Sequence, residues 1–121
     1  MARVRDPGAT GAAGTGTEEL TIRVYALVTD LMDRSRIGAA IPGTEFVRDV
    51  DSCGPADVVI VDLAKFGSIV PSVRAAAPTA RVVCFGPHVD DASAEAARAA
   101  GAHAVMPRSR FFRDPLAAVE E

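Results

Sequence analysis

The segment from Ala56 to Leu63, ADVVIVDL, constrains the fold of this chain more than any other. Its four consecutive β-branched residues are typical of a strand buried on both faces. Strands of that kind belong to parallel sheets covered by helices. The run ends on an acid, Asp62, at the carboxyl end of the strand, where open α/β sheets collect ligands and chemistry. Asp62 is therefore a candidate reactive group, metal ligand or helix cap.

Length, composition and charge narrow the class of protein. A chain of 121 residues suits one domain, and its hydrophobic content of 49% with no Trp fits thin α/β layers. A net charge of −3 gives no reason to expect a nucleic acid or an anionic membrane as partner. Cys53 and Cys84 lack the spacing of a zinc site or a disulfide framework, and Cys84 is expected to be a small buried hydrophobe. No apolar stretch approaches the ~18 residues of a membrane span. We therefore expect a cytoplasmic protein.

The pattern of apolar residues predicts a disordered tail over 1–19 and one domain over 20–121. Strands are expected over 21–28, 44–50, 57–63, 81–85 and 102–106. Helices are expected over 31–40, over 68–77 and from Asp91 or Ser93 to Ala100, with a last helical turn over 116–119. Gly101 supplies a left-handed stop after the third helix. The alternation of strands and helices predicts a parallel α/β sandwich.

One connection is too short for this scheme. Only six residues separate Val50 from Asp57, whereas a parallel crossover usually takes a dozen or more. Either a crossover helix is shortened or missing, or the second strand is irregular or antiparallel. That strand, over 44–50, is also the most polar and is expected at a sheet edge.

Over about 21–121 the chain resembles the receiver domains of two-component response regulators. The Ala56–Leu63 segment looks like their third strand, with Asp62 as the phospho-accepting aspartate. The segment 97–107, ARAAGAHAVMP, is similar to their fourth helix, Gly-Ala turn and fifth strand. Asp30 falls in the position of their acidic pair. The resemblance implies a flavodoxin-like open parallel five-stranded sheet with helices on both faces.

The resemblance also implies a site. Asp62 would be phosphorylated, and Asp30 and Asp62 would hold Mg²⁺, the one cofactor expected. Three positions depart from the family pattern: Thr29 replaces the first acid, Gly86 replaces the switch Thr or Ser, and Arg108 replaces the lysine. Glycine has no hydroxyl to read a phosphoryl group, and arginine is not equivalent to lysine at a tight site. The chain thus resembles a degenerate receiver, or pseudo-receiver.

Several residues keep alternative interpretations. Asp62 could instead pair with Arg108 or cap the helix that follows Ser68. His88, which we include with Gly86 and Arg108 among the switch or pocket residues, could bind a metal with Asp90 and Asp91. Helix capping explains these two acids equally well.

The segment Arg108–Arg113, RSRFFR, allows two interpretations. It could be a phosphate or nucleic-acid patch. The alternative is that its Phe side chains pack on the sheet while its arginines are solvated. By resemblance, the same segment lies in a region that receivers use to dimerise or dock.

Together these features predict a stand-alone receiver-like domain of bacterial two-component signalling or phosphorelay, with impaired aspartyl phosphorylation and no enzymatic activity. Its expected partner is a protein, a histidine kinase or another regulator, with a homodimer through Arg108–Arg113 also considered. We expect neither a nucleic-acid nor a membrane partner. The alternative is a flavodoxin-like module that binds a small anionic ligand at the carboxyl edge of the sheet. An enzyme using His88 with Asp62 has the least support, because no nucleophile–base pair is identifiable by spacing.

Overall fold

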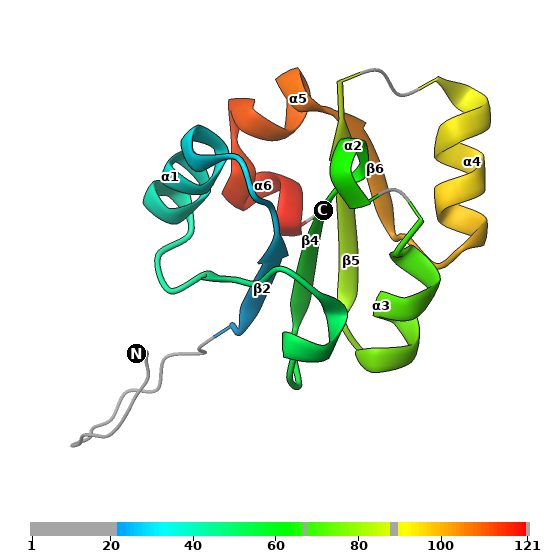
Figure 1. Ribbon diagram of the computed structural model, residues 1–121. Helices are drawn as coiled ribbons and strands as arrows, with labels where there is room; N and C mark the ends of the chain where they lie inside the picture. The colour runs from blue at the N-terminus through cyan, green and yellow to red at the C-terminus, as the bar shows by residue number, and fades with distance from the viewer. Residues whose placement is uncertain (1–21, 67, 88–89, 121) are drawn as a thin grey trace.

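A computed structural model describes residues 22–66, 68–87 and 90–120 of the chain (Figure 1). The tail expected over 1–19 lies outside the described residues. Five parallel strands form one sheet in the order β3-β2-β4-β5-β6, which confirms the flavodoxin-like prediction. The strands are β2 (Val24–Leu27), β3 (Glu45–Phe46), β4 (Val58–Asp62), β5 (Arg81–Gly86) and β6 (Ala104–Pro107). The helices are α1 (Leu31–Ala40), α2 (Leu63–Phe66), α3 (Val70–Ala76), α4 (Asp91–Ala99), α5 (Arg108–Arg113) and α6 (Pro115–Glu120).

Helices cover both faces of the sheet, as Figure 1 shows. On one face Ile60 of β4 belongs to a core that includes Ile37 of α1 and Phe111 of α5. On the other face Val59 and Val61 pack with residues of α3 and α4. Side chains alternate between the two cores along β4, and every residue of the strand is buried. The β-branched run is therefore a central strand buried on both faces, as its sequence predicted.

The short connection before β4 contains no crossover α-helix. Its place is taken by a single 3₁₀ turn, η1 (Val50–Ser52), which the side chain of Asp49 caps by accepting from the Ser52 N–H at 2.9 Å. β3 nevertheless runs parallel to β2, with Tyr25 opposite Glu45. It is an edge strand of two residues, much shorter than the predicted 44–50. The short spacing left two alternatives open, a missing helix or an irregular second strand. The structure confirms the first: the crossover helix is missing, and β3 is parallel to β2.

Several local predictions need correction. The short helices α2 and α5 were not expected. The predicted helix over 68–77 is the shorter α3, and the cap of α4 is Asp90, whose carboxylate accepts from the Ser93 N–H at 2.7 Å. Leu31 and Met32, the apolar residues at the start of α1, are 77% and 74% exposed. Gly101 has the expected left-handed conformation, with φ of 123°.

Candidate functional site at the carboxyl edge of the sheet

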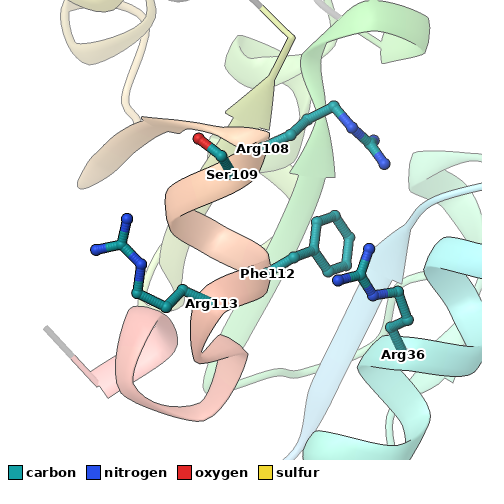
Figure 2. Close-up of a pocket in the computed structure, with 5 residues that line it drawn as sticks. All are labelled: Arg36, Arg108, Ser109, Phe112 and Arg113. Atoms are coloured by element: carbon teal, nitrogen blue, oxygen red, sulfur yellow. The ribbon is translucent and has the colours of Figure 1, made fainter.

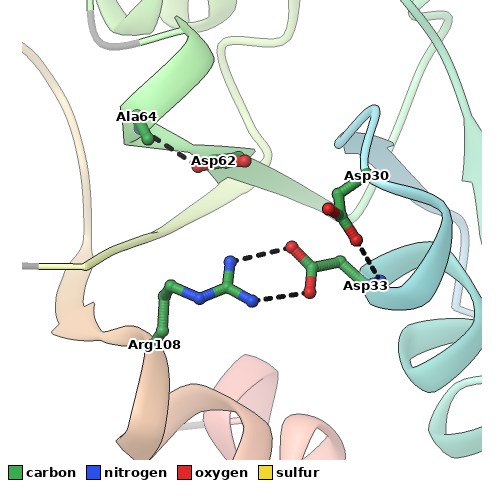
Figure 3. A network of polar contacts seen from close by, with 5 residues as sticks. All are labelled: Asp30, Asp33, Asp62, Ala64 and Arg108. Atoms are coloured by element: carbon green, nitrogen blue, oxygen red, sulfur yellow. Dashed lines mark hydrogen bonds and ion pairs between the residues drawn. The ribbon is translucent and has the colours of Figure 1, made fainter.

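Four of the sequence-predicted residues lie at the carboxyl ends of the strands. Asp30 follows β2, Asp62 ends β4, Gly86 ends β5 and Arg108 follows β6. Because all strands are parallel, their carboxyl ends share one edge of the sheet. Figure 3 shows the two aspartates and the arginine gathered there. His88, the remaining candidate, lies outside the described residues, so its role stays a prediction.

Asp62 is buried at this edge of the sheet, with only 4% of its surface exposed. Its Oδ1 accepts a hydrogen bond from the Ala64 N–H at 3.0 Å (Figure 3). The carboxylate therefore caps the first turn of α2, which starts directly after β4, rather than the later helix after Ser68 that was considered. Burial raises the pKa of Asp62 above its ordinary value, and the Ala64 N–H and the Arg108 guanidinium oppose that rise.

Arg108 pairs with Asp33, not with Asp62. Its two terminal nitrogens donate to the two carboxylate oxygens of Asp33 at 2.8 and 2.6 Å (Figure 3). This is the bidentate geometry that favours arginine over lysine. The guanidinium also lies 5.6 Å from the ring centroid of Phe85 and 5.1 Å from that of Phe112. The hydrogen bonds with Asp33 raise the pKa of Arg108 further. The expectation that this arginine is simply solvated was wrong.

Asp33 is the residue that sequence reasoning missed. It lies on α1, is 2% exposed, and shares the buried side of the helix with Ile37 and Ile41. The spacing of these three positions, four residues apart, places them on one helical face. An acid in an apolar helical stripe is buried and therefore needs a cationic or hydrogen-bonding partner. An acid at an apolar position of the helix is the sequence signal that points to Asp33.

Asp30 and Gly86 complete the edge. Asp30 is exposed and caps α1, because its Oδ1 accepts from the Asp33 N–H at 3.0 Å. Thr29, beside it, is exposed as well. Gly86 is buried at the end of β5, opposite Pro107 of β6. No side-chain hydroxyl is available at that position to meet a group bound on Asp62.

The donor set falls short of the magnesium site that the resemblance implies. Within the described ranges, no three His, Cys, Asp or Glu side chains are grouped so as to hold a metal ion. Asp33, the third acid of the edge, is engaged on both oxygens by Arg108. The oxygens of Asp30 and Asp62 remain as donors, and each residue already caps a helix. Two carboxylates can hold magnesium only when further ligands come from waters or a phosphate.

The aromatic part of the Arg108–Arg113 segment packs as expected. Phe111 is fully buried and stacks on Phe85, with ring centroids 4.8 Å apart. Phe112 is half-buried and meets both rings edge-on. The three rings fix α5 onto the sheet, and thereby fix the position of Arg108 at the edge.

No helix in the part of the chain that the structure describes is long and apolar enough to cross a membrane.

Two solved response regulators have a similar fold. A response regulator from Burkholderia pseudomallei, with a phosphorylated aspartic acid, a calcium ion and citrate, matches with a TM-score of 0.68 and 14% identity. The match covers 80% of this chain and 66% of that protein. A response regulator from Thermotoga maritima matches with a TM-score of 0.66 and 14% identity over 84% of this chain and 100% of that one. No family model and no curated protein matches the sequence. The chain therefore has the flavodoxin-like fold of response-regulator receivers.

Proposed function

We propose that this chain is a receiver-like signalling domain that acts through a protein partner and has lost the phosphorylation switch. It works in the cytoplasm and has no enzymatic activity of its own. One observation carries the proposal: Arg108, which follows the last strand, forms a bidentate ion pair with Asp33 of α1. A lysine-like role toward a phosphoryl group on Asp62 would require Arg108 to leave a bidentate ion pair.

The neighbouring positions support the same conclusion. Phosphoryl transfer to a carboxylate relies on a metal to neutralise charge and on positioned groups that stabilise the transferred phosphoryl. Thr29 removes one metal-binding acid, and Gly86 removes the hydroxyl that would respond to the phosphoryl group. The chain keeps the fold but lacks an acid and a hydroxyl that phosphorylation would use.

A protein partner suits the surface beside this edge. Leu31 and Met32, at the start of α1, expose most of their apolar surface. Exposed apolar side chains next to a polar edge are typical of protein contact surfaces. The partner class that the sequence suggests, a histidine kinase or another regulator, remains part of the proposal, as does a homodimer through Arg108–Arg113.

The test is incubation of the chain with Mg²⁺ and a small phosphodonor such as acetyl phosphate, followed by intact-mass measurement. The wild-type chain is expected to gain no phosphoryl group. Thr29→Asp restores the missing acid at an exposed position and is the gain-of-function arm. An adduct in Thr29→Asp that disappears with Asp62→Ala supports the proposal. A stoichiometric adduct in the wild-type chain that disappears with Asp62→Ala overturns it.

A further inference from the structure

We propose that a surface recess over α5, beside α1, binds a small ligand that carries two or more phosphate groups. The recess has a volume of about 530 Å³ and is lined by Arg36, Arg108, Ser109, Phe112 and Arg113 (Figure 2). It shares Arg108 with the edge that carries Asp62. This inference goes beyond the proposed function and does not depend on it.

The guanidinium groups of two arginines contact one aromatic ring in this recess. The guanidinium carbon of Arg36 lies 4.8 Å from the ring centroid of Phe112, and that of Arg108 lies 5.1 Å from the same centroid. Figure 2 shows Arg36 and Phe112 pointing toward one another, while Ser109 and Arg113 lie on the other flank of α5. The residues that line the recess therefore come from both sides of α5. A ligand that meets both flanks must be longer than a single phosphate.

Two of the arginines that line the recess have no carboxylate partner among the residues that the structure describes. Three guanidinium groups line it, and the carboxylate of Asp33 neutralises one of them through Arg108. Among the residues that the structure describes, neither Arg36 nor Arg113 forms an ion pair. Asp114, which follows Arg113 in the sequence, keeps its negative charge, and its carboxylate accepts from the Ala117 N–H rather than from an arginine of the recess. Because the chain as a whole carries −3, the positive recess is a local feature and not a result of a basic composition.

The lining favours a small phosphate ligand over an acidic protein surface. Protein interfaces are centred on apolar or aromatic anchors that become fully desolvated. Phe112, the one ring in the recess, is already in contact with two guanidinium groups. Arginine forks match phosphate oxygens, and the Ser109 hydroxyl adds a further donor. The volume also lies within the range of small-ligand sites.

The test is isothermal titration calorimetry of the full chain with inorganic pyrophosphate and with inorganic phosphate at constant ionic strength. We expect pyrophosphate to bind more tightly than phosphate. Arg36→Gln and Arg113→Gln should each raise the Kd for pyrophosphate about tenfold, the loss expected for one charge-assisted hydrogen bond. The matched control is Arg98→Gln, an exposed arginine of α4, which packs on the other face of the sheet. It should change the Kd by less than about twofold, because an isolated surface charge contributes little.

Three results would overturn the proposal. One is the absence of binding heat at millimolar pyrophosphate. Another is an equal loss of affinity in Arg98→Gln, which would mean that the anion responds only to overall charge. The third is tighter binding of a poly-glutamate peptide than of pyrophosphate, with the same dependence on Arg36 and Arg113. That result would assign the recess to an acidic protein segment instead.

Discussion

Replacing Arg108 with alanine is expected to destabilise the domain more than replacing its partner, Asp33. The two charge-assisted hydrogen bonds between them are short, at 2.6 and 2.8 Å, but the two side chains differ in exposure. The Asp33 side chain is 3% exposed and that of Arg108 is 37% exposed. Removal of the arginine therefore leaves a mostly buried carboxylate without its counter-ion, whereas removal of the aspartate leaves a guanidinium that is already partly exposed to water.

The magnitudes follow from that asymmetry. Breaking a fully buried ion pair costs roughly 3–5 kcal/mol, and breaking a surface pair costs about 0–1 kcal/mol. For this half-exposed pair, Arg108→Ala should cost about 2–3 kcal/mol, which includes the lost contacts with Phe85 and Phe112. Asp33→Ala should cost about 1–2 kcal/mol. The double variant should show a coupling free energy of at least ~1 kcal/mol.

Urea unfolding at pH 7, followed by far-ultraviolet circular dichroism because the chain has no Trp, measures these free energies. Arg98→Ala is the control for loss of a positive charge on the surface and should stay within about 0.5 kcal/mol of the wild type. The reasoning fails if Asp33→Ala costs more than Arg108→Ala. It also fails if the coupling free energy is indistinguishable from zero, since the ion pair would then contribute nothing.

Two further predictions concern single positions. The folded pKa of Asp62 is raised, so the native state binds its proton more tightly than the unfolded state, and this acid lowers stability as pH rises above its ordinary value of 3.8. Asp62→Asn should therefore be more stable than the wild type in urea unfolding at pH 7, with the difference closing as pH falls to about 3.8; a variant that is less stable at pH 7 would contradict this. Gly101→Ala should cost about 1–3 kcal/mol, because φ is 123° and the new Cβ would overlap Cγ of Arg74. Its control, Gly38→Ala within α1, has open space and should gain about 0.5–1 kcal/mol in thermal unfolding; equal effects of the two changes would refute the reasoning.

The sequence predicted the parts of this fold that depend on local pattern. The β-branched run before Asp62 identified the central strand, and the short spacing after Val50 predicted that either the crossover helix or the second strand is irregular. The contacts that bring α1 and α5 together could not be predicted in this way. Arg108 meets Asp33 across 75 positions of sequence, and Phe111 of the same helix packs on Phe85 of β5. The partner of a charged residue depends on such long-range packing, so the candidate site was predicted by position but not by pairing.

The short strand β3, which precedes the 3₁₀ turn η1, is the part of the sheet that should open most easily. β3 pairs with β2 at only two register positions, whereas β4 pairs with β5 along its full length. Local opening free energies in a domain range from near zero to the global value, and they follow such differences in packing. The amide protons of β3 should thus exchange with solvent long before those of β4. The edge that carries Asp62 and Arg108 is supported by the other four strands, so this opening leaves it in place.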